Sequence, residues 1–253
     1  MSRAELNYAA RVDLALAFRA CDFYDLGYGI YNHITQRAPA RNGDGDVMLV
    51  CPYGLHFSEV TASRLIGVDF DTGEVLEGDG EIAATASAIH RAIHKARYPV
   101  DGITSVMHTH QPYTTALACL DDPEPIKFAL HQTAMLFYNR VAYDWDYTGI
   151  ALEEDEGERL AKILGDKAVL LMGNHGVLVV GKRACDAFSD LHGLECAAKN
   201  QILVQSTGLK MRMAPEKVVK EVATPDPRYG DHQKMFYDSL KRMLKDSKPC
   251  FMD

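Results

Sequence analysis

Apolar positions recur along the chain with two alternating periods. In residues 1–27 they recur about every 3.6 residues with acidic residues among them, which predicts an amphipathic helix rather than a secretion signal. This spacing places the apolar side chains on one face, so each such segment should cover a core. The other segments with this pattern are residues 84–97, which Pro99 should end, residues 153–164, residues 183–208, which should end at Gly208, and residues 231–246.

Segments typical of β-strands separate these helices. Residues 28–51 resemble a hairpin around a turn rich in Gly, Asn and Asp, and residues 64–80 resemble a second hairpin around Asp-Thr-Gly. Residues 102–110 and 139–145 are strand-like, and residues 167–182 form two very apolar strands broken at Gly-Asn-His-Gly. Because helices and strands interleave, we expect a three-layer α/β/α sandwich around a mainly antiparallel or mixed sheet.

The length and composition fit one large globular domain. The chain has 253 residues, of which 47% are hydrophobic and 25% charged, enough to build a sizeable core. We expect this domain over residues 1–210 and a helical tail over residues 211–253, interrupted by Pro215, Pro225 and Pro227. The tail should pack on the domain or on a neighbouring subunit.

Charge and cysteine usage exclude several classes of protein. A net charge of −8 argues against general nucleic-acid binding, which needs a basic face for phosphates. The chain has no apolar run long enough to span a membrane, so we expect no membrane partner. The six cysteines are scattered without C-x-x-C spacing, which indicates free thiols in a reducing, cytoplasmic compartment.

Three histidines are candidate metal ligands. His108 and His110 lie at the end of a predicted strand, where residues two apart point to the same face and can converge on one ion. Such a pair alone is a weak signal. His175 strengthens it, because this residue interrupts two apolar strands where an unpaired polar group is costly, and the flanking Gly173 and Gly176 permit an unusual backbone. The alternative for His175 is an exposed residue in a tight turn. Three neutral imidazoles form an open site for a divalent cation.

These motifs resemble the class II aldolase and adducin family. The segment VMHTHQPYTTALA, followed later by GNHGVL, carries the resemblance, and GIYNHITQR, CPYGLHFSEVTASRL and IHRAIHKARYPV support it in family order. The resemblance covers roughly residues 8–208. It implies a central sheet flanked by helices and a zinc or other divalent ion on His108, His110 and His175. It also implies a small-molecule substrate and a homo-oligomer, commonly a tetramer with active sites at subunit boundaries.

The chain departs from the sugar-phosphate aldolases of that family in its proton-transfer residues. Their acid/base glutamate lies four residues before the counterpart of His90, and this chain has Ala86 there. Their proton-moving tyrosine corresponds to Gln132, which follows His131 and has no useful acid/base chemistry at neutral pH. The resemblance therefore implies a metal site without the retro-aldol proton machinery.

The phosphate-binding positions also differ. The aldolases bind substrate phosphate with a Gly-Asn, a Thr-Gly and a Ser-Ser pair, which together offer many hydrogen-bond donors. The pairs at the corresponding positions here are bulkier and more apolar, namely Asn32-His33, Tyr53-Gly54 and Ala84-Thr85. Classical sugar-phosphate aldolase or epimerase activity is therefore not expected, and the pattern resembles the adducin-like branch.

Several other polar residues are candidates for the missing chemistry. His131 and His33 could replace the lost base if they lie near the metal, since imidazole titrates in the useful range, and Gln132 could hydrogen-bond substrate. Structural roles remain the alternative for both histidines. His192 and Glu195, three residues apart on one helix, could bind a metal, although a helix-surface or interface pair is favoured.

Three functions fit these observations. The first is a metal-dependent lyase that cleaves a C–C bond in, or decarboxylates, a small non-phosphorylated hydroxy or keto compound; the ion would be zinc, with manganese or iron as alternatives. The second is a non-haem iron oxygenase on the same three histidines, although two histidines and one carboxylate are more usual. The third is a non-catalytic interaction module of the adducin kind.

Overall fold

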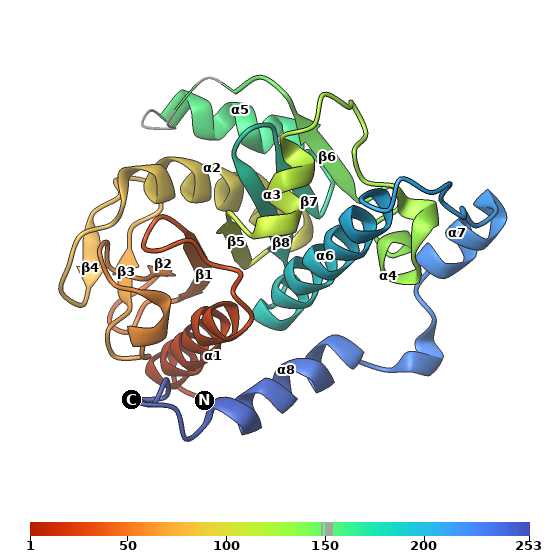
Figure 1. The fold of residues 1–253 in the computed structure, drawn as a ribbon. Coiled ribbons are helices and arrows are strands. Elements are labelled where there is room, and N and C mark those ends of the chain that lie inside the picture. The colour runs from red at the N-terminus through yellow and green to blue at the C-terminus, as the bar shows by residue number, and fades with distance from the viewer. Residues whose placement is uncertain (148, 150–153) are drawn as a thin grey trace.

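The computed structural model describes residues 1–147, 149 and 154–253 (Figure 1). In this part of the chain eight strands form one sheet in the order β4-β3-β2-β1-β5-β8-β7-β6, and every neighbouring pair is antiparallel except β6 and β7. The two predicted hairpins are the pairs β1/β2 and β3/β4. The strands are β1 (His33–Pro39), β2 (Asp46–Val50), β3 (Ile66–Val68), β4 (Val75–Glu77), β5 (Ser105–Thr109), β6 (Val141–Asp144), β7 (Val169–Met172) and β8 (Gly176–Gly181).

Helices cover both faces of the sheet, which confirms the predicted three-layer arrangement. Helices α2 and α5 pack together over one face, and α1 and α6 lie over the other (Figure 1). The short helix α3 follows β5 directly and packs on α6. The helices are α1 (Arg3–Phe23), α2 (Ala84–Asp101), α3 (Pro112–Ala118), α4 (Gln132–Met135), α5 (Glu154–Leu164), α6 (Ala184–Gln205), α7 (Glu216–Ala223) and α8 (His232–Leu244).

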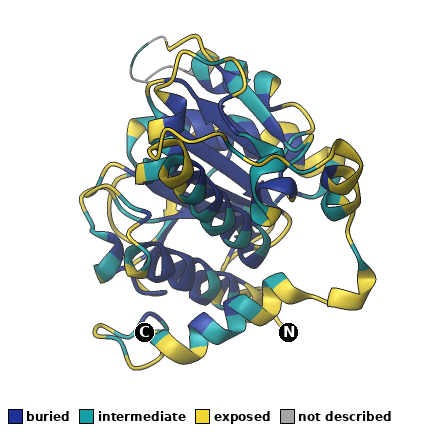
Figure 2. Cartoon of the chain, turned by 45° about the vertical axis from the view of Figure 1, so that its right-hand side comes forward, coloured by how far each residue is buried: buried dark blue, intermediate teal, exposed yellow. Residues whose placement is uncertain are grey.

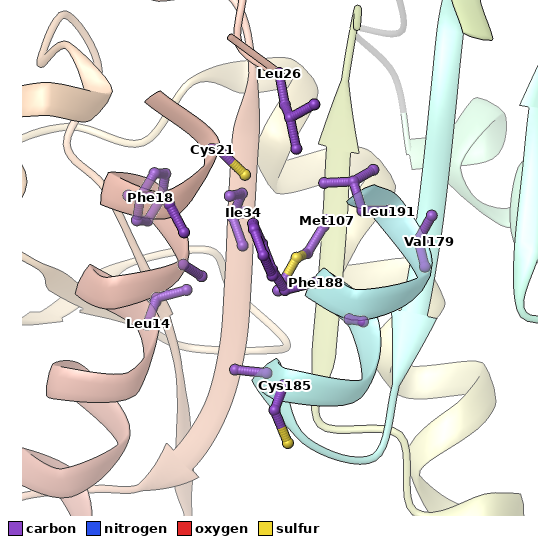
Figure 3. Packing of buried hydrophobic residues seen from close by; sticks show 14 of the residues in the cluster. Leu14, Phe18, Cys21, Leu26, Ile34, Met107, Val179, Cys185, Phe188 and Leu191 are labelled. Carbon is purple, nitrogen blue, oxygen red and sulfur yellow. The ribbon is translucent and has the colours of Figure 1, made fainter. Parts of the chain in front are cut away.

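Side-chain alternation along the central strands builds a separate core on each face. In β5, Val106 packs in the core beneath α2 and α5, whereas the adjacent Met107 packs in the core beneath α1 and α6. Figure 3 shows the second core, in which Phe18 of α1 and Phe188 of α6 flank Ile34 of β1. Because successive residues of a strand point to opposite faces of the sheet, the same alternation determines the face on which each polar residue of β1 and β5 lies.

The C-terminal residues return to the start of the chain. Helix α8 contacts α1 and α6, and the side chains of Tyr237, Leu240 and Phe251 are buried in the same core as α1. The outer side of α8 is exposed, and the chain ends close to its N-terminus (Figures 1 and 2). The backbone amide of Ala62 donates to the carbonyl of Phe251, which ties the terminal residues to the domain. In a single chain, therefore, part of residues 211–253 packs on the domain itself.

Some helix boundaries differ from the sequence expectation. Helix α2 continues through Pro99 to Asp101, because a proline in the last turn removes one backbone hydrogen bond without breaking the preceding turns. Its end is Gly102, whose φ of 72° is the left-handed conformation that glycine tolerates. Helix α6 ends at Gln205, before Gly208. Residue 153, expected to begin a helix, lies outside the described residues. None of the helices described is both long and apolar enough to span a bilayer.

Candidate metal centre and active-site cavity

The three predicted metal ligands come together at one end of the sheet. His108 is in β5, His110 follows that strand, and His175 lies in the turn between β7 and β8. Strand β8 is the neighbour of β5, with His108 opposite Leu178, so the turn before β8 lies beside the end of β5. One ring nitrogen from each of the three histidines lies within 4.8 Å of the others.

The donor set fits a divalent cation. The Nδ1–H of His108 donates to the carbonyl of Val177 at 3.0 Å, which leaves its Nε2 lone pair free, and this Nε2 lies 3.0 Å from Nε2 of His110. Tetrahedral zinc with Zn–N bonds of about 2.0–2.1 Å would hold its nitrogens about 3.3 Å apart, so a small adjustment suffices. Burial lowers the pKa of His110 to about 4 and that of His108 well below its usual range, so both rings are neutral and able to coordinate.

The Gly-Asn-His-Gly turn works differently from the sequence expectation. Its left-handed residue is Asn174, with φ of 54°, and neither glycine has a positive φ. The glycines instead allow close packing: a Cβ on Gly176 would lie 2.6 Å from the carbonyl oxygen of Thr109 and 2.8 Å from Cδ2 of His110. Gly176 is therefore needed because β8 passes directly against the segment that carries two of the metal ligands.

Glu195 anchors the segment after His110, a role that sequence reasoning missed. Its Oε1 accepts the amide hydrogen of Tyr113 at 2.8 Å, and its Oε2 accepts the amide and hydroxyl hydrogens of Thr114 at 2.8 and 2.7 Å. The carboxylate is buried and caps the start of α3, where free amides favour a negative charge. The favoured prediction of a helix-surface or interface pair is wrong for Glu195, because its carboxylate is buried within the chain. His192 packs against the rings of Tyr24 and Phe236.

A chain of buried side chains runs from the metal site into the layer of α2. Nδ1 of His33 lies 2.7 Å from Nε2 of His90, whose Nδ1 lies 2.7 Å from the hydroxyl of Thr35, and that hydroxyl lies 2.9 Å from Nε2 of His94. His33 is opposite His108 across β1 and β5, and their ring centroids are 4.8 Å apart. Burial lowers the pKa of His33 and His94 to about 3, so these imidazoles are neutral.

A cavity of about 690 Å³ opens onto the three histidines. His33 also lines it, together with Thr85 and Ala86, the latter at the position where the aldolase resemblance places a glutamate. Because alanine carries only a methyl group, position 86 supplies no acid or base to the metal site. Among the described residues that line the cavity there is no lysine, arginine, aspartate or glutamate. Within the part of the lining that the structure describes, the site therefore offers neutral imidazoles and no charged side chain.

His131 and Gln132 are not among the residues that line this cavity. They lie at the start of α4, which packs against α6 and α7, and Nδ1 of His131 accepts the amide hydrogen of Thr133 at 3.2 Å. Gln132 is exposed. In a single chain the structure thus brings His33 to the three metal ligands and leaves His131 and Gln132 elsewhere.

The sequence matches a known family over most of its length. The model of the Class II Aldolase and Adducin N-terminal domain covers residues 12–202. The chain belongs to this family. The chain also has the fold of the aldolase II superfamily protein from Pseudomonas syringae. The crystal structure of that protein matches this chain with a TM-score of 0.87 and 33% sequence identity, over 98% of this chain and 96% of that one. The histidine cluster is thus of the kind that holds a divalent metal in class II aldolases.

Two relatives in this aldolase and adducin family carry named activities. Decarboxylase NovR from Streptomyces niveus is 33% identical over 204 residues, which are 79% of this chain and 70% of that protein. The 4-hydroxy-3-prenylphenylpyruvate oxygenase/4-hydroxy-3-prenylbenzoate synthase from Streptomyces roseochromogenus subsp. oscitans is 32% identical over 189 residues, 74% of this chain and 65% of that protein. Members of one family at this level of similarity therefore have different named activities.

Proposed function

We propose that this protein is a divalent-metal-dependent lyase that cleaves a C–C bond in, or decarboxylates, a small non-phosphorylated hydroxy or keto acid. The observation that carries the proposal is the convergence of three neutral imidazoles on a cavity whose described lining has no charged side chain. Such a lining has no cation to bind a sugar phosphate and no carboxylate to act as the aldolase base. Zinc is the favoured ion, because it accepts three imidazoles and keeps an open position.

Decarboxylation fits this arrangement better than an aldol cleavage. A divalent ion bound to the three histidines would supply an electron sink for a substrate carbonyl group β to the departing carboxylate. Loss of carbon dioxide then requires one proton to be delivered to the remaining carbon, whereas an aldol cleavage also requires a base for a substrate hydroxyl. His33 is the side chain placed to move that proton, since it lines the cavity beside His108. The family relationship to decarboxylase NovR is consistent with this choice.

The proposal extends to the assembly and its location. We propose a homo-oligomer, a tetramer by family analogy, in which His131 and Gln132 of one copy reach the cavity of another. The exposure of Gln132 in a single chain allows such a contact. We also propose a cytoplasmic location, as the scattered cysteines suggest.

Iron-dependent oxygenation is the second candidate, because one relative is named an oxygenase and three imidazoles also accept iron(II). A non-catalytic module is the third. Metal analysis and turnover separate the three. The protein is loaded with zinc, manganese or iron(II) and incubated with a panel of hydroxy and keto acids that includes 3-oxo acids, with and without oxygen. A lyase releases carbon dioxide or an aldehyde without oxygen, and an oxygenase consumes oxygen only with iron.

The matched variants are His108→Ala, which removes a ligand, and His232→Ala, which removes an exposed histidine at the start of α8. The first should lose bound metal and turnover, and the second should keep both. Bound metal without turnover of any acid would contradict the lyase and favour the module. A wild-type protein that binds no metal would overturn the proposal entirely.

A further inference from the structure

We infer that Thr35 of β1 and His90 and His94 of α2 are positioning residues that set the tautomer of His33. The tautomer that they select carries its hydrogen on Nδ1 and presents the lone pair of Nε2 to the cavity. This inference rests on the proposed function, in which His33 moves a proton, and it adds the residues that prepare His33 for that role.

The positioning residues lie wholly inside one copy of the protein. Thr35, His90 and His94 are fully buried, and His33 is 7% exposed. The contacts among the four side chains join β1 to α2 of the same chain. A neighbouring copy that covers the cavity therefore leaves these contacts unchanged.

One hydroxyl couples the two histidines of α2. Oγ1 of Thr35 lies 2.7 Å from Nδ1 of His90 and 2.9 Å from Nε2 of His94. Burial lowers the pKa of both histidines far below its usual range, so each ring is neutral and carries one hydrogen. A hydroxyl has a single hydrogen, so it donates to one ring and accepts from the other. The tautomer of His94 therefore determines that of His90.

The same reasoning extends to His33. Nε2 of His90 lies 2.7 Å from Nδ1 of His33, so one of these two atoms carries a hydrogen and the other accepts it. The four side chains then have two consistent arrangements. Every hydrogen bond donates toward His94, or every hydrogen bond donates toward His33. The first arrangement leaves a lone pair on Nε2 of His33, and the second leaves an N–H group there.

The inner end of this chain of hydrogen bonds favours donation toward His94. Burial lowers the pKa of His94, and a contact with the backbone of Ile103 raises it in part. A backbone group favours a proton on a neighbouring ring only through its carbonyl oxygen. The ring atom left for this contact is Nδ1, which has no partner at full hydrogen-bond geometry among the described residues. A hydrogen on Nδ1 is attracted by the carbonyl, whereas a lone pair would be repelled and left without a donor.

The outer end favours the same direction. The ring of His33 lies beside the metal ligands, 4.8 Å from that of His108 between centroids. Nε2 of His33 lies 3.4 Å from the hydroxyl of Thr85, and both residues line the cavity. A cation held beside this ring stabilises a lone pair on the cavity side and destabilises an N–H group there. Both ends thus select a hydrogen on Nδ1 of His33.

The selected tautomer suits the proton transfer that decarboxylation requires. Nε2 of His33 takes a proton from solvent water and gives it to the carbon that keeps the electron pair of the broken C–C bond. Nδ1 retains its hydrogen, because the acceptor Nε2 of His90 stabilises the ring while it is charged. In the opposite tautomer the lone pair of His33 lies on Nδ1, against His90 and away from the cavity, so the ring could not take up a proton from there.

The experiment measures the tautomer directly by solid-state nitrogen NMR of the zinc-loaded protein labelled with ¹⁵N-histidine. Protonated and unprotonated ring nitrogens give well separated signals whatever the oligomeric state, and a His33→Gln spectrum identifies those of His33. We expect Nδ1 of His33 to be protonated and Nε2 to be unprotonated in nearly all molecules. Free neutral histidine prefers the opposite tautomer, so this result is no default. A protonated Nε2 in the neutral ring would overturn the inference.

Variants test whether the buried residues set this tautomer. His94→Phe removes the acceptor of the Thr35 hydroxyl, which should then donate to His90 and reverse the chain, so that Nε2 of His33 becomes protonated in most molecules. Thr35→Val breaks the chain one step earlier and should release the same preference. Thr35→Ser keeps the hydroxyl and should keep the wild-type tautomer. Thr115→Val removes a buried hydroxyl without a partner among the described residues and is the matched control.

Circular dichroism and zinc content identify the variants that fold. An unchanged tautomer of His33 in a folded, zinc-loaded His94→Phe or Thr35→Val protein would show that these residues do not set it, and the inference would be wrong. Turnover gives a second measurement, on the acid of the panel that the wild type decarboxylates fastest. We expect Thr35→Val to lower kcat by at least about tenfold with little change in KM, and Thr35→Ser to restore it.

Failure of this inference can be told apart from failure of the proposed function. Absence of bound zinc, or absence of turnover of every acid, contradicts the proposed function, and the NMR spectrum does not depend on turnover. Bound zinc and turnover together with a protonated Nε2 in neutral His33 overturn the inference alone.

Discussion

The cap that Glu195 places on α3 gives the sharpest test of how the fold supports the metal site. Replacing Glu195 with alanine removes the acceptor of three hydrogen bonds, from the amides of Tyr113 and Thr114 and from the Thr114 hydroxyl. Glu195 is 7% exposed, so water reaches the vacated donors only in part. A hydrogen bond to a charged group contributes about 1.5–3 kcal/mol, and partial rehydration recovers some of the sum. We expect a loss of about 3–5 kcal/mol in the free energy of unfolding.

The measurement is urea unfolding of the metal-free protein, followed by far-ultraviolet circular dichroism. Glu195→Gln keeps one acceptor oxygen and should lose only about 1–2 kcal/mol. Glu221→Ala, at an exposed glutamate of α7, is the control and should change the stability by less than about 0.5 kcal/mol.

The same variant should weaken the metal site, because α3 begins two residues after His110. Groups that orient metal ligands typically change the affinity by about 10–100-fold when removed. We therefore expect the zinc dissociation constant of Glu195→Ala, measured by chelator competition, to rise at least about tenfold. A stability loss below about 1 kcal/mol with an unchanged zinc affinity would refute the assigned role.

Three further predictions follow from the site. Gly176→Ala should weaken zinc binding, because its Cβ would lie 2.8 Å from Cδ2 of His110; Gly193→Ala, where the added Cβ would have ordinary contacts of 3.6 Å or more, should not. An equal effect of both substitutions on zinc affinity would contradict this explanation. The metal-free protein should lose stability as the pH falls from 6.5 toward 3, because His94 has its pKa lowered to about 3 in the fold and takes up a proton more readily when unfolded. His94→Gln should reduce that slope by up to about 1.4 kcal/mol per pH unit in urea unfolding, and an unchanged slope would argue against a buried neutral ring. Mixing a His108→Ala protein with a His131→Ala/Gln132→Ala protein under subunit-exchange conditions should restore activity if sites lie between copies, and no recovery after confirmed exchange would place His131 and Gln132 outside the chemistry.

The sequence by itself determined the elements and much of the metal site. Periods of two and about 3.6 residues predicted both hairpins and most helices, because they record which face of each element is buried. His108 and His110 could be paired from sequence alone, since residues two apart on a strand share a face. The replacement of the aldolase glutamate by Ala86 could also be recognised from the sequence, because recognising it requires only the family resemblance.

Only the tertiary structure decided which residues meet across long separations. The pairing of β5 with β8 brings His175 to the H-x-H pair, and the packing of α2 on β1 joins His33 to His90. No local period signals such contacts, because a periodic pattern states that a face is buried but not what covers it. The contact of Glu195 with the start of α3 could not be predicted for the same reason, because within its own helix this residue resembles a surface carboxylate. The metal ligands could thus largely be predicted from local sequence. The residues that hold those ligands in place, and the set of residues that lines the cavity, depend on how distant elements pack.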